Sequence, residues 1–284
     1  MKPKTVRVYS ANNYFQHFEV LKSNRNKRHI YREFFVEGVR NINEAVKNRW
    51  QINALIYSGD KVLSDWAADL LKNVPAARFA LAASLMEQLS DKEDTSELIA
   101  IVRMPEDNLS RIKLVKESII VVFDRPASKG NLGSIIRSCD AFGAGGLIIT
   151  GHAVDLYDTE TIRASTGSFF KLPVVYVPAI TDLEQWLNKA RNDFPDLVTA
   201  GTSEKGDIDI DRYEFTRPAI ILMGNETAGL SRNLLQMSDV LVKIPMAPDT
   251  SASSLNVASA ASIFLYEINR QRHSSNSKGQ NSKP

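Results

Sequence analysis

The chain has 284 residues, 43% hydrophobic and 24% charged, with a formal net charge of +2. This length allows two domains, the composition is ordinary for a soluble globular protein, and the near-neutral charge says little about partners. The single cysteine, Cys139, excludes an internal disulfide and suits a reducing compartment. The sequence has no apolar signal core and no segment near the ~20 apolar residues that span a bilayer. We therefore expect a cytoplasmic protein without a membrane segment.

The first part of the chain alternates between short helical and strand patterns. We predict helices over residues 14–23, 39–49, 62–71 and 85–89, and strands over residues 33–36, 53–57, 78–81 and 98–102. This alternation predicts a small α/β sandwich over residues 1–112. Residues 105–116 are polar with few apolar repeats, so we place the interdomain linker there.

The amino-terminal region is strongly basic. Residues 1–32 contain eight Lys and Arg against one acid, Glu19, which gives +7: Lys2, Lys4, Arg7, Lys22, Arg25, Lys27, Arg28 and Arg32. One interpretation is a phosphate-binding arm, with Lys22, Arg25, Lys27, Arg28 and Arg32 as the candidate contacts. The alternative is a solvated basic face, and charge alone does not decide between them.

Residues 117–270 read as a second α/β domain. Strands are predicted over residues 118–123, 147–150, 174–177, 197–200, 219–223 and 240–244, and helices near 131–142, 159–164, 182–192 and 253–270. Strands separated by helices imply a parallel sheet covered on both faces. Residues 271–284 are polar and low in apolar content, so we predict a disordered tail there.

Three polar loops follow predicted strands of this second domain. They cover residues 124–131, 224–229 and 245–254, and parallel α/β sheets bind ligands beyond the carboxyl ends of their strands. These loops and the helices that follow them hold Asn131, Arg137, Glu226, Ser254 and Asn256. The four histidines are scattered and there is no H-E-x-x-H or C-x-x-C pattern, so a catalytic metal is not expected. The sequence predicts a polar pocket without an obvious nucleophile.

At these loops the chain resembles a known family. The segments N-L-G-S-I-I-R (residues 131–137), L-M-G-N-E-T-A-G-L (222–230), and I-P-M (244–246) followed by S-L-N-V (254–257) are similar to the three ordered motifs of the SpoU, or TrmH-like, branch of the SPOUT RNA ribose 2′-O-methyltransferases. The segment F-F-V-E-G-V-R (34–40) and the strand near residue 100 are similar to the ribosomal-protein-like substrate-binding domain of many members.

The resemblance implies a fold, a reaction and an assembly. Members fold the carboxyl-terminal domain into a trefoil knot, bind S-adenosylmethionine in a bent shape and work as homodimers. They methylate the ribose 2′-hydroxyl of structured RNA, and we expect ribosomal RNA here, with transfer RNA as an alternative. We accordingly expect an RNA-binding domain over residues 1–112 and a methyltransferase domain over residues 117–270.

The same resemblance assigns roles to individual residues. Arg137, Asn131 and Glu226 match the family's catalytic positions, and Ser254 and Asn256 match its third polar pair. The residues expected at the cofactor are Thr202, Met223, Gly224, Ile244, Met246 and Leu255. Each also has a structural reading: Asn131 as a helix cap, Arg137 with Glu226 as an ion pair, and Ser254 with Asn256 as caps of the last helix.

One departure from the family pattern supports a rival hypothesis. Residues 247–253, A-P-D-T-S-A-S, contain no glycine and form a longer loop than the family's third motif usually has. A non-catalytic RNA-binding or assembly factor of the same fold would tolerate such a change. The intact Asn131, Arg137, Glu226 and Asn256 favour an enzyme instead.

Overall fold

The structure describes residues 4–90 and 94–280 of the chain in a computed structural model, with side chains described as far as His273. The chain divides into two units. The first comprises Met1–Glu106 together with Asp155–Lys171, and the second comprises Asp107–Val154 together with Leu172–Pro284. Among the described residues, no helix is long and apolar enough to cross a membrane.

The first unit is built on a five-stranded mixed sheet with the order β1-β4-β3-β5-β2. Its strands are β1 Thr5–Val8, β2 Glu33–Glu37, β3 Ile52–Ser58, β4 Ala77–Leu81 and β5 Leu98–Arg103. β1, β4 and β3 run parallel, whereas β5 is antiparallel to both β3 and β2. The four predicted strands are present. β1 was missed because it is a short edge strand in which only Val8 is buried.

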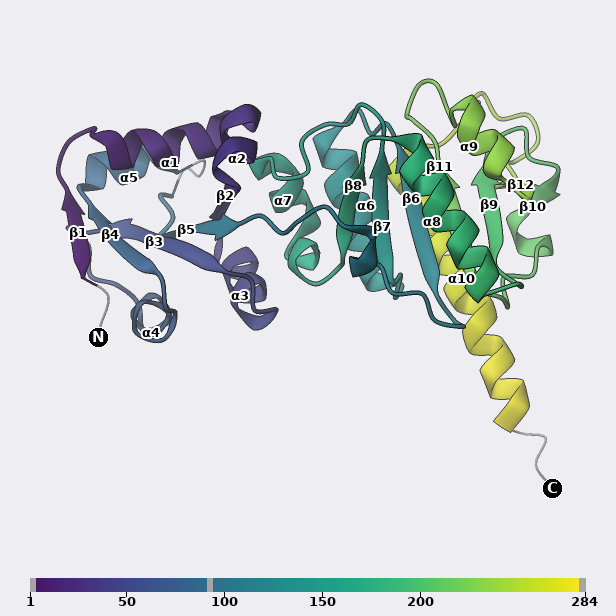
Figure 1. Ribbon diagram of the computed structural model, residues 1–284, viewed down its shortest axis with the longest axis horizontal. Coiled ribbons are helices and arrows are strands. Elements are labelled where there is room, and N and C mark those ends of the chain that lie inside the picture. The colour runs from purple at the N-terminus through teal and green to yellow at the C-terminus, as the bar shows by residue number, and fades with distance from the viewer. Residues whose placement is uncertain (1–3, 91–93, 281–284) are drawn as a thin grey trace. The chain divides into compact units, whose positions relative to one another are not determined.

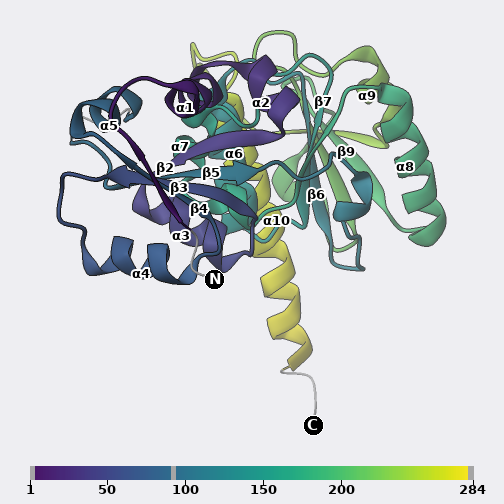
Figure 2. The ribbon, with the colours of Figure 1, turned by 60° about the vertical axis from the view of Figure 1, so that its left-hand side comes forward.

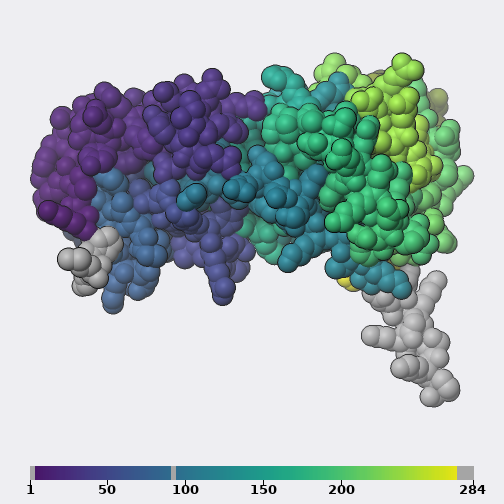
Figure 3. Space-filling model, in the orientation of Figure 1, coloured from purple at the N-terminus to yellow at the C-terminus, as the bar shows by residue number. Residues whose placement is uncertain are grey.

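Helices cover both faces of this sheet. α1 Asn13–Ser23, α2 Arg25–Tyr31 and α5 Ala83–Leu89 lie on one side, and α3 Val39–Lys47 and α4 Asp65–Asn73 lie on the other (Figures 1 and 2). On the first side, Phe15 and Phe18 of α1 and Met86 of α5 pack on sheet residues such as Ile56. The predicted α/β sandwich is confirmed. The outer sides of α1 and α2 form a continuous exposed surface (Figure 3).

The segment Asp155–Lys171 packs in the first unit, although the sequence placed its helix in the second domain. It contains α7 Thr159–Ser165 and the 3-10 turn η2 Ser168–Phe170. A buried ion pair holds it: the Arg28 guanidinium lies 2.6 Å from the Asp155 carboxylate and 3.4 Å from that of Asp158. In addition, the Trp50 indole N–H donates to the Phe170 carbonyl at 2.8 Å. Such long-range contacts leave no periodic signal in the sequence.

The burial of Arg28 corrects one predicted RNA contact. Its side chain is 1% exposed, and its Nη1 also donates to the carbonyls of Leu21 and Lys22 at 2.9 and 2.8 Å. Since a charged side chain is buried only when it is paired and hydrogen-bonded, Arg28 serves the fold. Lys22, Arg25 and Arg32 are half-buried, and Lys27 is exposed with its Nζ 5.9 Å from the centre of the Tyr31 ring.

We predict that Arg28→Ala lowers the free energy of unfolding by about 3–5 kcal/mol, because it leaves the buried Asp155 carboxylate without its cation. Urea unfolding followed by circular dichroism measures the change. Lys27→Ala, on the same helix but exposed, is the control and changes stability by less than about 0.5 kcal/mol. Equal stability of the two variants would show that Arg28 is not a structural residue.

The second unit is built on a seven-stranded sheet with the order β10-β12-β9-β11-β6-β7-β8, in which every pair is parallel. Its strands are β6 Ile119–Asp124, β7 Gly146–Thr150, β8 Val174–Val177, β9 Val198–Thr202, β10 Ile208–Asp209, β11 Ala219–Met223 and β12 Val240–Lys243. The predicted parallel sheet is confirmed. The two-residue β10 was missed because it is too short to carry a pattern.

Helices lie on both faces of the second sheet as well. α8 Ile180–Asp193 and α9 Arg232–Met237 cover one face, and α6 Lys129–Ala141 and α10 Val257–Gln280 cover the other (Figures 1 and 2). Leu183 and Leu187 of α8 pack on sheet residues such as Val122. α6 and α10 pack side by side, and the hydroxyls of Ser138 and Ser262 lie 2.8 Å apart between them. The 3-10 turns η1 Leu109–Arg111 and η3 Ile210–Arg212 occupy connections.

The predicted disordered tail over residues 271–284 is wrong in its first part, because α10 continues through Gln280. Gln271 accepts a hydrogen bond from the Phe215 N–H at 2.9 Å. The Arg272 guanidinium donates to the backbone carbonyls of Phe215 and Arg217 at 2.9 and 2.7 Å and to that of Glu117. These polar side chains therefore dock the helix on the second unit. Residues 281–284 lie outside the described residues.

Candidate functional site at the carboxyl edge of the parallel sheet

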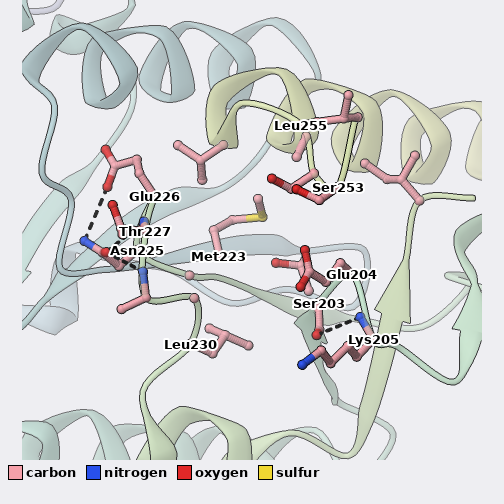
Figure 4. Close-up of a pocket in the computed structure, with 18 of the residues that line it drawn as sticks. Ser203, Glu204, Lys205, Met223, Asn225, Glu226, Thr227, Leu230, Ser253 and Leu255 are labelled. Atoms are coloured by element: carbon pink, nitrogen blue, oxygen red, sulfur yellow. Dashed lines mark hydrogen bonds between the residues drawn. The ribbon is translucent and has the colours of Figure 1, made fainter. Parts of the chain in front are cut away.

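A cavity of about 520 Å³ lies where the loops after β9, β11 and β12 meet (Figure 4). These strands and β6 are neighbours in the sheet and all run parallel, so the segments that leave their carboxyl ends are brought together. All six residues predicted to contact a cofactor line this cavity: Thr202, Met223, Gly224, Ile244, Met246 and Leu255. Glu226 and Ser254 also line it. Apart from Thr202, these lining residues come from the second and third motifs, whereas Asn131 and Arg137 of the first motif do not line the cavity.

Gly224 is required by the tight path of the loop after β11. A Cβ atom at this position would lie 2.5 Å from the backbone of Gly229 and Leu230. The approach is this close because the loop closes on itself, with the N–H of Asn225 and that of Gly229 each donating to the other's carbonyl at 3.0 Å. No side chain fits there, and the backbone of the loop borders the cavity directly.

The Glu226 carboxylate joins this loop to the start of α6. It accepts hydrogen bonds from the backbone N–H groups of Ala127 and Ser128, both with a shortest distance of 3.0 Å. It also accepts from the side-chain amide of Asn131 at 3.3 Å. A helix amino terminus carries unpaired N–H groups and a partial positive charge, so an anion is favoured in this position. The alternative reading of Glu226 as an ion-pair partner of Arg137 is not what the structure contains.

Asn131 lies between Glu226 and Asn256. Its Nδ2 donates to Glu226, and its Oδ1 accepts from the Asn256 Nδ2 at 3.1 Å. Asn131 is not the cap of α6, because Ser128 is the N-cap residue and its Oγ accepts from the Asn131 N–H at 3.3 Å. The Asn256 Oδ1 accepts from the Ala258 N–H at 2.9 Å at the start of α10, so Asn256 caps that helix and also contacts Asn131. Two motifs distant in sequence are thereby joined.

Arg137 stands apart from this network. It is exposed on α6, does not line the cavity, and has no hydrogen bond or ion pair to any described residue. Six residues separate it from Asn131, which corresponds to about 240° around a helix, so the two side chains project from different faces. Ser254 is likewise exposed. Two residues after Arg137 on α6, Cys139 is fully buried, and burial raises the pKa of its thiol, which fits a core residue rather than a nucleophile.

Three residues that sequence reasoning did not single out hold the edge of the sheet together. Asp124, at the end of β6, is 3% exposed and accepts from the Thr150 hydroxyl at 3.1 Å and the Ser231 N–H at 2.8 Å. Its neighbour Arg125 donates to Asp124 and to the Gly229 carbonyl, both at 3.0 Å. The Asn225 amide donates to the Arg125 carbonyl at 2.7 Å. Their position directly after buried strands was the only available signal.

The loop over residues 247–253, where the sequence differs from the family's third motif, has no regular secondary structure. Residues 247–253 are exposed, and Asp249 adopts a left-handed φ of 60°. Aspartate tolerates this region better than most residues other than glycine. The two ends of the loop, Met246 and Leu255, still line the cavity and are each 38% exposed. Within the described part of the chain no cluster of His, Cys, Asp and Glu suited to a metal ion occurs.

The fold and site define an α/β protein with a ligand cavity beyond the carboxyl ends of a parallel sheet. The SpoU rRNA methylase family matches residues 118–266, and the SpoU L30e-like domain matches residues 12–100. The chain belongs to the SpoU rRNA methylase family. The resemblance found in the sequence motifs is confirmed.

Relatives and solved structures agree with this assignment. The chain is 46% identical to the 23S rRNA (uridine(2479)-2′-O)-methyltransferase of Streptomyces viridochromogenes over 95% of this chain and 94% of that protein. It is similar to the crystal structure of the SpoU methyltransferase AviRb from the same organism in complex with AdoMet, with a TM-score of 0.88, 47% identity, and coverage of 93% and 99%. The AdoMet-bound rRNA methyltransferase of Sinorhizobium meliloti gives a TM-score of 0.82 at 28% identity, with coverage of 94% and 98%.

The role of Glu226 as a connector can be tested by stability. Glu226→Gln places an amide N–H opposite backbone donors, so we expect a loss of about 1–2 kcal/mol in the free energy of unfolding. Thr227→Ala is the matched control. Thr227 is exposed in the same loop, and its hydrogen bond to the Asn225 side chain uses its backbone N–H, which alanine keeps. Chemical denaturation measures both variants. A Glu226→Gln protein as stable as the control would mean that the carboxylate does not hold the loop to α6.

Proposed function

We propose that this chain transfers a methyl group from S-adenosylmethionine to a ribose 2′-hydroxyl in ribosomal RNA. Its membership of the SpoU rRNA methylase family supports this function, as does the named activity of the relative that spans almost its full length. The observation that carries the proposal is the hydrogen-bonded chain Glu226–Asn131–Asn256, which joins all three family motifs at the edge of one cavity.

The cavity suits the proposed cofactor. Its volume of about 520 Å³ lies in the range of small-molecule sites. Met246 and Leu255 offer exposed apolar surface for a flat base, and the loop at Gly224 offers backbone groups for polar contacts. In this proposal Thr202, Met223, Gly224, Ile244, Met246 and Leu255 hold the cofactor. When bound, it supplies an electrophilic methyl group.

The side chains around the cavity would position the RNA hydroxyl. Guanidinium keeps its proton under nearly all conditions, so Arg137 acts as a donor that orients the 2′-hydroxyl and an adjacent phosphate. The phosphate or water then takes the proton. Asn131, held at both polar ends by Glu226 and Asn256, fixes the ribose, and Ser254 lies at the mouth of the site. Because Asn131 is held before the RNA binds, its amide needs little reorganisation during the reaction.

A homodimer would complete the site. Arg137 does not reach the cavity of its own chain, so a second copy is the natural source of the guanidinium. Tyr266 and Ile263 on α10 are 55% and 37% exposed, and Tyr266 packs against Phe142 at the carboxyl end of α6, which leaves apolar surface along this helix pair. An exposed apolar surface of this kind is expected to be covered by a partner.

The first unit is the proposed RNA-binding domain. Lys22, Arg25, Lys27 and Arg32 remain candidate phosphate contacts, and Arg28 is withdrawn because it is buried. Such contacts would give salt-dependent affinity for a structured RNA. We favour ribosomal RNA because the family and the relative are named for it. The trefoil knot, transfer RNA as a substrate and the cytoplasmic location remain predictions from the sequence.

The rival function is a non-catalytic factor of the same fold, which the unusual loop over residues 247–253 favours. Against it, the ends of that loop still line the cavity and the amide–carboxylate chain is complete. Absence of S-adenosylmethionine binding in calorimetry would favour the rival.

The role of Arg137 is tested by single-turnover methylation of ribosomal RNA at saturating RNA. We expect Arg137→Ala to lower the rate about a hundredfold or more, because an aligned donor is lost from the transition state. Arg137→Lys keeps the charge but not the planar fork, so its rate falls by roughly tenfold. Lys129→Ala, on the same helix, is the control. Near wild-type rates in both Arg137 variants would remove Arg137 from the mechanism.

A mixed-dimer experiment tests which chain supplies Arg137. Leu255→Trp fills the cavity and Arg137→Ala removes the guanidinium, so each homodimer is inactive. If the site is shared between copies, unfolding and refolding an equal mixture restores about a quarter of the wild-type activity, because half of the dimers carry one intact site. A mixture that stays inactive, although mass spectrometry detects mixed dimers, would place Arg137 in the site of its own chain.

A further inference from the structure

A charged turn borders the cavity after β9. In the segment from Ser203 to Gly206 the Gly206 N–H donates to the Ser203 carbonyl at 3.1 Å, so Glu204 and Lys205 occupy the two central positions of a β-turn. The Ser203 hydroxyl accepts from the Lys205 N–H, also at 3.1 Å. Sequence reasoning assigned no role to these residues.

The turn is fixed at both ends to β12. The Ser203 N–H donates to the Val242 carbonyl and the Asp207 N–H to the Leu241 carbonyl, each at 3.1 Å. A Cβ atom on Gly206 would lie 2.7 Å from the backbone carbonyl carbon of Val242, so only glycine permits this approach. The two charged side chains therefore project from a backbone that is held in place before any ligand binds.

Few residues that line the cavity carry a charge, and the negative ones outnumber the positive ones. Among the residues that line it, Glu204, Lys205 and Glu226 carry charge, which leaves one net negative charge. The Glu226 carboxylate is already occupied by N–H donors of the α6 terminus. Glu204 and Lys205 are both exposed, and Figure 4 shows them beside Ser203, with Met223 between them and Glu226. They are thus the charges available to a bound molecule.

We propose that the Glu204–Lys205 turn makes the cavity selective for the positively charged methyl donor over its neutral demethylated product. This inference rests on the proposed function. S-adenosylmethionine carries a sulfonium, an ammonium and a carboxylate, whereas S-adenosylhomocysteine keeps the last two and lacks the sulfonium charge. Glu204 interacts favourably with the additional positive charge, and Lys205 pairs with the carboxylate that both molecules share.

The proposal predicts different changes in ligand affinity for the two side chains, and calorimetric titration measures both. Glu204→Gln weakens binding of S-adenosylmethionine by roughly 3–10-fold and that of S-adenosylhomocysteine by less than about twofold, because only the former carries the charge that Glu204 attracts. Lys205→Met weakens both by a similar factor but leaves 5′-methylthioadenosine, which has no carboxylate, unchanged. Asp207→Asn is the matched control, since Asp207 adjoins the turn, is exposed and does not line the cavity. Thermal unfolding checks that each variant is folded.

The outcomes distinguish this inference from the function on which it rests. If the wild-type chain does not bind S-adenosylmethionine, the proposed function fails and the inference fails with it. If the wild type binds but Glu204→Gln weakens both ligands equally, or neither, charge selection by the turn is wrong and the proposed function stands. A selective loss in Glu204→Gln that is absent in Asp207→Asn supports the proposal.

Discussion

The carboxylate of Glu226 at the amino terminus of α6 is the interaction on which the site depends. It comes from the loop after β11, accepts from two backbone N–H groups ahead of the helix, and holds the amide of Asn131. Because a helix terminus offers unpaired donors and a partial positive charge, this position suits a carboxylate that is only half-buried. Removing it would take away the side-chain hydrogen bond that joins the second motif to Asn131 of the first.

Rigidity at the edge of the sheet is supplied by groups that are distinct from those proposed to act on the RNA. The buried Asp124 joins the ends of β6 and β7 to the start of α9, and Asn225 fixes the Glu226 loop to Arg125. The exposed Arg137 lies on α6, and the exposed Glu204–Lys205 turn is held by backbone hydrogen bonds to β12. A site assembled before its ligands bind loses less conformational entropy on binding.

Charge has two different uses in the chain. In the first unit Arg28 is buried against Asp155 and Asp158, where it fastens a segment that lies far away in sequence. Lys27 on the same helix is exposed and available to a phosphate. The basic run of the amino terminus is therefore part structural and part surface, and the count of positive charges alone does not distinguish the two.

Sequence patterns were sufficient to predict the longer strands and most of the helices, whereas the short strands β1 and β10 carried too little pattern. Apolar runs such as β6 and β11 are buried strands, and the six candidate cofactor residues, five of them in the family motifs, line one cavity because parallel strands end at a common edge. Only the tertiary structure decided which partner each polar group takes: Glu226 binds Asn131 rather than Arg137, Arg28 is buried, and α10 continues past residue 270 through the contacts of Gln271 and Arg272. Local periodicity reports which face of an element is apolar, whereas these pairings join residues roughly 50 to 130 positions apart and depend on how the chain packs.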